Sequence, residues 1–459
     1  MACLWHHQTE TTLEIPSTEL FSNVTYYIIL VTVGEVKWKV KHRYKDFYNL
    51  HNRLVLDHGV SKDILPSKKV IGNKSNEFVE SRRNALEKYL QKILTFLKRM
   101  MPKVFVEFLD FHLYDIYFIL QELSLKCYAE ADFILSSTKT YTLTPLELHA
   151  ISEFLKVPFP EVENRLDLGP ILDMCSQLEN LTIAGSSNNY LQSSIVLNKL
   201  PFEITHLKIQ NSLYLKNVSF KMIHSLGNLR NTLSSLKVSY TTTENVSDVL
   251  QCDILHKNTI EGSEKWLALE TLDLSHNNII DIDKTISLAV NLKHLVLNDN
   301  KISTISNLTH LPKLEHLSII NNLITICDEL HTKVGNIKTM NLSQNNIVTA
   351  KGFCKVYSLE NLDLSCNKIT DVEELEYLGK LPCLENMRLT GNSVSTEVDY
   401  RVKVLELFGE RAKDIYLDNE KASQAELDKV SVLRALRIVK EGKTPDLSIE
   451  KSDNSSSSG

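Results

Sequence analysis

The chain has 459 residues, of which 43% are hydrophobic and 24% charged, so it can build several packed domains. The net charge of -6 is uneven, because residues 1–113 carry 17 Lys and Arg against 12 Asp and Glu while the remainder carries 34 against 45. No run of about 18 apolar residues occurs, and no basic stretch at the start leads into an apolar one, so we expect neither a membrane-spanning helix nor a signal peptide in this sequence.

This charge distribution predicts that the basic front domain meets an anionic partner. An ordinary small domain also often carries such an excess, so the individual residues must decide. The eight cysteines show neither CxxC pairs nor zinc-ligand spacing. We therefore expect reduced, mostly buried thiols in a cytoplasmic protein, with no metal site.

Residues 10–113 predict one α+β unit. The β-branched and aromatic run from Val24 to Val33 indicates a strand, Gly34 a hairpin turn, and the alternating run from Val36 to Arg43 a second strand. Helical periodicity follows in three stretches, at residues 47–54, 86–97 and 105–112.

The middle of the chain is less regular. Residues 114–165 predict a helical connector. Residues 166–260 contain irregularly spaced LxxLxL-like pieces, such as the one at Leu178, Leu181 and Ile183, and are interpreted as degenerate repeats.

A regular repeat begins at residue 266. The pattern Leu269-xx-Leu272-x-Leu274-xx-Asn277 recurs five times, at intervals of 22 to 25 residues. It predicts an α/β leucine-rich-repeat solenoid over residues 266–420, in which each asparagine bonds the backbone of neighbouring coils and residues 399–420 form a cap. Residues 421–459 are expected to be helical and then disordered. The recurring asparagines are Asn277, Asn300, Asn322, Asn345, Asn367 and Asn392.

Three segments of the front domain could deliver basic and aromatic side chains to one anion site. They read RYKDF at 43–47, LPSKKVIG at 65–72 and RRNALEKYL at 82–90. Arginine forks grip phosphate in a bidentate manner, lysine supplies a point charge, and an aromatic face can lie under a sugar ring.

In this order, with the strand hairpin before them, the segments resemble the PX domain, a phosphoinositide-binding module with a three-stranded sheet and helices. The resemblance implies that Arg43 binds the 3-phosphate, Tyr44 stacks on the inositol ring, Lys68 binds the 1-phosphate and Arg82 binds the 4- and 5-hydroxyls. It thereby implies phosphatidylinositol 3-phosphate as the lipid. Arg82 rather than Arg83 has the matching spacing to Leu86 and Tyr89, although this register is the less secure. The competing interpretation of Arg43 is a plain strand-end charge.

The proline loop predicts a membrane contact through Lys69, Val70, Ile71 and Lys74. The two apolar side chains would enter the lipid interface while the lysines meet anionic headgroups. Alternatively, Val70 or Ile71 packs on the domain.

Stretches from VKHRYKDFYNLH to the cap at DYRVKVL resemble the N-terminal part of the nischarin (imidazoline receptor antisera-selected protein) family. The resemblance implies a scaffold in the cytoplasm and on endosomal membrane, with the plasma membrane a further address. It also implies binding to integrin tails, Rac and effector kinases in the control of cell migration.

The variable strand positions of the repeats predict a concave protein-binding face that includes Asp273, His294, His316, Asn341, Asp363 and Arg388. No catalytic motif or cofactor site is recognisable: Gly72-Asn73-Lys74-Ser75 lacks the full phosphate-loop pattern, and we expect no enzyme. The leading hypothesis is a phosphoinositide-binding scaffold that binds no nucleic acid, with a homo-oligomer left open. The alternative is a purely protein-binding repeat regulator, similar to phosphatase regulators, whose PX fold binds no lipid.

Overall fold

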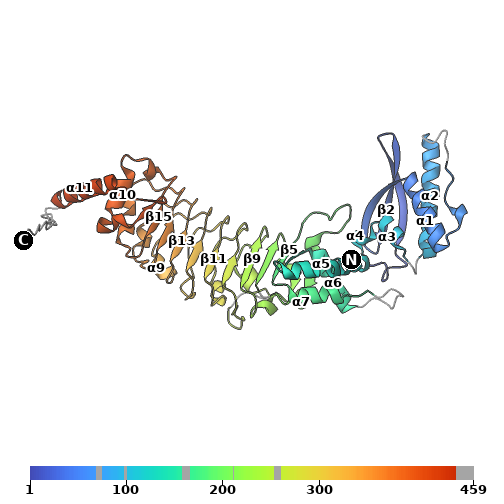
Figure 1. Cartoon of the computed structure of the whole chain (residues 1–459), viewed down its shortest axis with the longest axis horizontal. Helices are drawn as coiled ribbons and strands as arrows, with labels where there is room; N and C mark the ends of the chain where they lie inside the picture. The colour runs from blue at the N-terminus through green and yellow to red at the C-terminus, as the bar shows by residue number, and fades with distance from the viewer. Residues whose placement is uncertain (69–74, 98–100, 158–165, 210, 253–259, 441–459) are drawn as a thin grey trace, which may run out of the picture. The chain divides into compact units, whose positions relative to one another are not determined.

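The computed structural model describes residues 1–68, 75–97, 101–157, 166–209, 211–252 and 260–440. The chain divides into two compact units, Met1–Thr241 and Thr242–Gly459 (Figure 1). The division falls inside the stretch 166–260 that the sequence predicts as degenerate repeats. The tail predicted to be disordered, residues 441–459, lies outside the described residues.

Unit 1 begins with a three-stranded antiparallel meander, as predicted: β1 (Thr12–Phe21), β2 (Val24–Val33) and β3 (Val36–Arg43). The β1–β2 turn has two residues, Ser22 and Asn23, both with positive φ, which matches the twist of a tight hairpin. Gly34 at the β2–β3 turn also has positive φ, at 56°, so glycine is favoured there.

Helices cover the inner face of this sheet. They are α1 (Tyr44–His58), α2 (Asn76–Leu97), α3 (Lys103–Phe108) and α4 (Phe111–Tyr114). The predicted apolar faces are buried, with Phe47, Leu50 and Leu54 on α1 and a leucine-rich stripe on α2. From Tyr27 onward, the strand alternation places the odd-numbered residues of β2 in the core and leaves the even-numbered ones half-exposed.

The predicted helical connector, residues 114–165, contains the two helices α5 and α6 and also the strand β4. β4 begins a row of parallel strands in the order β4, β5, β7, β9. The sequence did not predict β4, because a strand of four residues is too short to show a clear hydrophobic alternation. The elements are α5 (Ile116–Ser136), β4 (Thr140–Leu143), α6 (Pro145–Lys156), α7 (Gly169–Gln177), β5 (Asn180–Ala184), β6 (Phe202–Glu203), β7 (Ser212–Lys216), β8 (Ile223–His224) and β9 (Ser235–Ser239), with 3-10 turns at Lys62–Ile64, Leu197–Lys199, Phe220–Met222 and Leu226–Leu229.

The front domain is joined to these strands through the outer edge of β3. Lys39 N donates to the Gln192 carbonyl at 3.0 Å, and Ser194 N donates to the Lys37 carbonyl at 2.8 Å. Trp38, on the inner face, donates to the Leu109 carbonyl at 2.7 Å and packs against Tyr114. The free edge of the sheet is therefore covered by residues about 150 positions further along the chain.

Unit 2 consists of stacked coils, each of which contributes one short strand. Strands β10 to β16 pair in parallel, residue against residue, with a leucine or methionine at the buried centre of each pairing from β10 to β15. The elements are α8 (Ser247–Leu250), β10 (Thr271–Asp273), β11 (His294–Val296), β12 (His316–Ser318), α9 (Leu330–Lys333), β13 (Thr339–Asn341), β14 (Asn361–Asp363), β15 (Asn386–Arg388), α10 (Tyr400–Glu406), β16 (Tyr416–Leu417), β17 (Glu420–Lys421) and α11 (Gln424–Lys440), with 3-10 turns at Lys284–Leu288, Lys351–Phe353, Val372–Leu375, Leu378–Lys380, Ser393–Thr396 and Gly409–Lys413.

The six repeat asparagines are buried, as predicted. Five of them bond a carbonyl of the preceding coil, namely Asn300, Asn322, Asn345, Asn367 and Asn392. At Asn367, Nδ2 donates to the Leu342 carbonyl of the preceding coil at 2.9 Å and to the Leu364 carbonyl of its own coil at 3.0 Å. Its Oδ1 accepts from Ile347 N at 3.0 Å. Asn367 is thus the acceptor for the buried Ile347 N–H, and it shares the two carbonyls with Asn345 and Asn392.

All eight cysteines are free thiols, as expected, but only four are buried. Burial raises the pKa of Cys127 to about 11 and that of Cys175 to about 12. Cys366 and Cys383 are exposed, so the expectation of mostly buried thiols holds for half of them.

Replacing Asn367 by alanine will destabilise unit 2, because the buried Ile347 N–H loses its acceptor, and a buried group left without a partner costs about 1–3 kcal/mol. The two carbonyls that Asn367 bonds keep Asn345 and Asn392 as donors. The exposed neighbour Lys368 provides the control, since Lys368→Ala should change the unfolding free energy by less than about 0.5 kcal/mol. Urea unfolding of the full chain measures both. Equal, small effects of the two substitutions would contradict the structural role of the asparagine.

Candidate functional site

Tyr44 is the centre of the predicted anion site. It is the first residue of α1 and directly follows β3. Its hydroxyl donates to the Pro66 carbonyl at 2.5 Å. This bond ties the loop that carries Lys68, which is exposed two residues further on, to the end of the sheet. We call Arg43, Tyr44, Lys68 and Arg82 the basic-aromatic site.

Arg43 is the residue that caps the start of α1. Its backbone N–H donates to Asp46 Oδ2 at 3.0 Å, and its Nε lies 3.4 Å from Asp46 Oδ1. The side chain is nevertheless 44% exposed. Asp46 therefore orients the guanidinium while leaving part of it accessible to a ligand.

Arg82 is buried in the same site, with only 9% of its surface exposed. Its Cζ lies 4.4 Å from the centre of the Tyr44 ring and 4.2 Å from that of Phe78. Among the described residues, Arg82 Nη2 is buried and has no hydrogen-bond partner. Leaving a charged donor buried and unpaired is costly, so this atom fits an oxygen acceptor supplied by a ligand.

The surrounding tyrosines remain neutral. Burial raises the pKa of Tyr27 and of Tyr44, and the nearby positive charge of Arg82 only partly opposes this effect. In the described part of the chain no carboxylate lies within ion-pair distance of Arg82. The site therefore retains a net positive charge that could attract an anion.

The structure separates the two adjacent arginines of α2. Arg83 points away from the site: its Nε lies 3.0 Å from Glu80 Oε2, and its Nη1 donates to the Ile15 carbonyl of β1. Arg82 alone meets Tyr44. The predicted membrane-contact residues Lys69, Val70, Ile71 and Lys74 lie outside the described residues.

The sequence analysis missed three residues of the site. Phe78 precedes Arg82 by one helical turn and stacks on its guanidinium, a spacing that could have been noticed. Tyr27 contacts Arg82 from β2 and Asp46 holds Arg43. The Tyr27 contact crosses from strand to helix, and no local pattern signals it.

The six predicted residues of the repeat face all lie on strands β10 to β15, with exposed or half-buried side chains. Several are already engaged within the chain. Asp273 and Asp363 accept from the N–H of Ser275 and Ser365, at 3.0 and 2.9 Å. These side chains shape the turn after each strand as well as the surface. Asn341 accepts from Ser343 in the same way, and Arg388 bonds Asn419 and lies 3.5 Å from Asp363.

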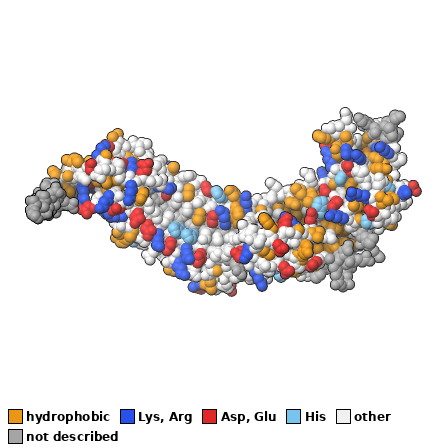
Figure 2. All heavy atoms as spheres, in the orientation of Figure 1, with side chains coloured by type: hydrophobic (Ala, Val, Ile, Leu, Met, Phe, Trp, Pro, Cys, Tyr) orange, Lys and Arg blue, Asp and Glu red, His pale blue; other side chains and the backbone are white. Residues whose placement is uncertain are grey.

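A histidine patch marks the centre of this face (Figure 2). The rings of His294 and His316 stack 4.5 Å apart, at an interplanar angle of 7°. Burial, followed by the neighbouring His316, lowers the pKa of His294. His294 is therefore neutral at physiological pH and offers a flat, aromatic and polar surface to a partner.

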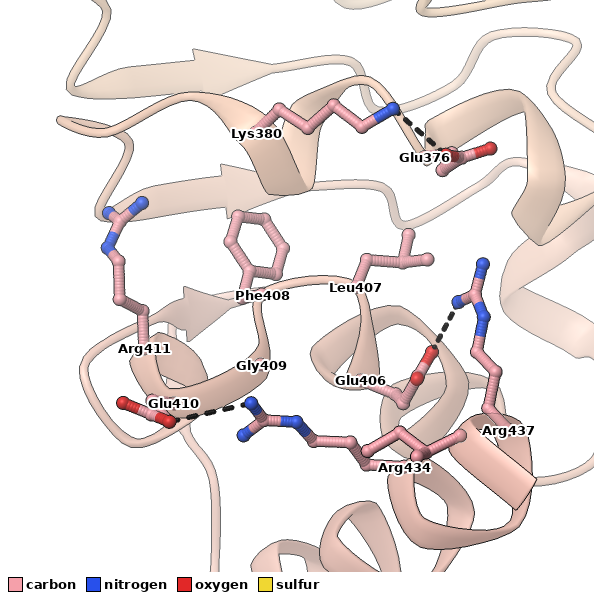
Figure 3. A pocket seen from close by; sticks show the side chains of 11 residues that line it. Glu376, Lys380, Glu406, Leu407, Phe408, Gly409, Glu410, Arg411, Arg434 and Arg437 are labelled. Atoms are coloured by element: carbon pink, nitrogen blue, oxygen red, sulfur yellow. Dashed lines mark hydrogen bonds and ion pairs between the residues drawn. The ribbon is translucent and has the colours of Figure 1, made fainter. Parts of the chain in front are cut away.

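A hollow of about 460 Å³ lies in the C-terminal cap, between α10 with its following turn and α11 (Figure 3). Its cations are matched within the chain: Arg437 lies 3.0 Å from Glu406, Arg434 lies 3.4 Å from Glu410, and Arg411 donates to two backbone carbonyls. The two arginine–glutamate contacts fasten α11 to the cap. Among the described residues that line the hollow, Arg411 is the one cation whose contacts are neutral carbonyls rather than a carboxylate.

Two further findings limit the chemistry of the described residues. No group of three or more His, Cys, Asp or Glu side chains among them could hold a metal ion. None of the helices that the structure describes is both long and apolar enough to cross a bilayer.

Comparison with known proteins assigns two regions. Residues 30–112 match the family model of the PX domain, and residues 268–324 match that of the leucine rich repeat. The chain therefore carries an N-terminal PX domain, the phosphoinositide-binding module of sorting nexins, and a leucine-rich-repeat region, a protein-interaction module.

The chain is 40% identical to sorting nexin-14 of Danio rerio over 74 residues, which are 16% of the chain and 8% of that protein. It is 37% identical over 86 residues to the PX domain-containing protein kinase-like protein of Rattus norvegicus, covering 18% of the chain and 14% of that protein. Among solved structures, a designed CISK-PX domain is similar at 33% identity over 21% of this chain and 97% of that one, with a TM-score of 0.21. The chain thus matches only a small part of its curated relatives' length.

Substituting the two neighbouring arginines will separate a ligand site from a structural contact. Arg82→Met removes an unpaired buried donor and keeps contact with Tyr44 and Phe78, so hydrogen exchange in α2 should change less than about fivefold. Arg83→Met loses its bond to the Ile15 carbonyl, and exchange in α2 and β1 should accelerate by about tenfold or more. Equal acceleration by both variants would make Arg82 a structural residue.

Proposed function

We propose that this protein is a peripheral membrane adaptor whose PX domain binds phosphatidylinositol 3-phosphate and whose repeat region binds a signalling protein. The observation that carries the proposal is the buried Nη2 of Arg82, which has no hydrogen-bond partner among the residues that the structure describes. Arg82 packs on Tyr44 at the end of β3, and Tyr44 bonds the loop that leads to Lys68.

The arrangement suits a singly phosphorylated inositol headgroup. Arg43, partly exposed and oriented by Asp46, would bind the 3-phosphate, and Lys68 would bind the 1-phosphate as a point charge. Arg82 would donate to the 4- and 5-hydroxyls, and Tyr44 would support the ring. An additional phosphate at the 4- or 5-position would need a further free cation beside Arg82. The rings of Tyr44 and Phe78 already pack against the guanidinium of Arg82.

The proposed location is the cytoplasmic surface of endosomes, with the plasma membrane as a second address. The resemblance of the sequence to the nischarin family supports this location. It also supports integrin tails, Rac and its effector kinases as partners, and a role in cell migration. The strand face around His294 and His316 is the proposed docking surface. We propose a role without catalysis, since binding alone accounts for both modules.

One observation favours the alternative of a purely protein-binding repeat regulator. The Arg43–Asp46 ion pair neutralises part of the charge that a phosphate would need. Phosphate binding would then have to displace Asp46 or use the remaining guanidinium nitrogens. The vesicle experiment below separates the two proposals.

In vesicle co-sedimentation of the full chain, we expect selective binding to phosphatidylcholine vesicles that contain phosphatidylinositol 3-phosphate. Arg43→Ala should weaken this binding by about tenfold or more, because a charge-assisted phosphate contact is lost. Arg53→Ala removes the same charge from an exposed site on α1 and should change affinity less than about twofold. Binding that is absent, or indifferent to Arg43, would favour the repeat-regulator alternative.

A further inference from the structure

His42 lies at the end of β3, directly before the arginine that is proposed to bind the 3-phosphate. It continues the inner-face row of the strand, and its side chain is 21% exposed. Its ring stacks on that of Phe108 in α3, with the ring centres 3.9 Å apart and an interplanar angle of 12°. The Phe47 ring of α1 meets it edge-on at 6.4 Å. The imidazole is thereby held between a strand and two helices.

One ring nitrogen of His42 is committed to a backbone acceptor. Nε2 lies 2.6 Å from the Phe108 carbonyl oxygen. Because a carbonyl can only accept a hydrogen bond, Nε2 carries the proton of the neutral ring and Nδ1 carries a lone pair. Nδ1 lies 3.8 Å from Asp46 Oδ2. The neutral ring therefore offers no proton to this carboxylate, and only a second proton, at Nδ1, would attract it.

Asp46 is shared between His42 and Arg43. Its Oδ2 accepts the Arg43 backbone N–H at 3.0 Å, and its Oδ1 lies 3.4 Å from Arg43 Nε. The Asp46 side chain is 33% exposed, so packing alone does not lock it in place. The carboxylate that restrains the guanidinium of Arg43 is therefore also the carboxylate that a charged His42 would meet.

The other charged groups around His42 come from two further elements. Asp110, in the link between α3 and α4, interacts electrostatically with His42 and His112, and burial raises the pKa of Asp110. On the sheet, His42 pairs in register with Tyr27 of β2, whose side chain interacts with Arg82. A positive charge on His42 would thus meet a carboxyl group on each of two sides, and Asp46 is the one that also holds the ligand-binding arginine.

We propose that His42 and Asp46 are positioning residues that make headgroup binding by the PX domain depend on pH. When Nδ1 of His42 takes up a proton from the solvent, its N–H draws Asp46 to the imidazolium, and the Arg43 guanidinium is released for the phosphate. Loss of that proton returns Asp46 to Arg43. Histidine ordinarily changes charge between about pH 5 and 8, so affinity rises as the pH falls through this range. The inference rests on the proposed phosphoinositide binding and assigns the regulation of that same site.

The test compares the full chain with His42→Gln, whose amide can keep the bond to the Phe108 carbonyl but cannot become charged. Affinity for phosphatidylcholine vesicles that contain phosphatidylinositol 3-phosphate is measured at about pH 8 and about pH 5.5. The two proteins should bind alike at the higher pH, and the variant should bind about two- to fivefold more weakly at the lower one.

The ratio of the two affinities at each pH is the quantity to compare, because the 3-phosphate itself gains a proton near about pH 6 in both experiments. His58→Gln, in the last turn of α1, is the matched control and should leave this ratio unchanged. If wild type and His42→Gln share one pH profile, the proposal is wrong.

A double-mutant cycle separates the action through Asp46 from direct attraction by the imidazolium. Asp46→Asn keeps an acceptor for the Arg43 N–H but removes the charge, so at about pH 8 it should bind about two- to fivefold more tightly than wild type. In that background, His42→Gln should have no further effect at about pH 5.5. A loss of affinity that persists without the Asp46 charge would show that His42 acts by its own charge and would overturn the coupling.

A lipid-free measurement distinguishes the coupling from the proposed function. The NMR chemical shift of Arg43 Nε, assigned by its absence in Arg43→Ala, should move between about pH 8 and about pH 5.5 in the wild type and stay in place in His42→Gln. If this movement occurs but no vesicle binds, the headgroup proposal fails and the coupling stands. If vesicles bind through Arg43 but the movement is absent, the coupling fails and the headgroup proposal stands.

Discussion

The repeat region depends on one constraint, which is that a chain turning inward must not bury backbone polar groups without partners. In the coil of Asn367, one asparagine side chain bonds two carbonyls and one N–H, and two of these three bonds reach the preceding coil. Because these two bonds join neighbouring coils, they hold adjacent strands in register. The strand face that remains is therefore a regular surface on which side chains can vary without disturbing the turn.

In the PX domain, by contrast, a buried polar side-chain atom lacks a described partner. Arg82 is nearly as buried as the repeat asparagines, yet one of its donors has no partner among the described residues. Structures tolerate such a group where a ligand completes it. Tyr44 and Phe78 sandwich the guanidinium and keep it in place. The repeat asparagines therefore serve the stability of the turns, whereas the Arg82 donor without a described partner supports the proposed ligand site.

The sequence alone was sufficient to predict a structural element wherever its residues recur at a regular spacing. The strands at 24–33 and 36–43 and the six buried asparagines follow directly from alternation and repeat spacing. Contacts between distant segments could not be predicted in this way. The pairing of β3 with residues 192–194, the strand β4 and the approach of Tyr27 to Arg82 depend on tertiary packing. The different roles of Arg82 and Arg83 became clear only when α2 was placed on the sheet. In the sequence, both arginines lie within one helical turn of the same apolar stripe.

The covered edge of β3 has a consequence for how this molecule can be divided. Cutting the chain after the PX domain would uncover the N–H of Lys39 and the carbonyl of Lys37, and would remove the Tyr190 ring that packs on Tyr114. An uncovered strand edge invites pairing with another chain. A PX domain transferred to a different protein would therefore need residues 190–194 as well. These residues cover the edge of β3, although they lie outside residues 30–112, which match the PX family model.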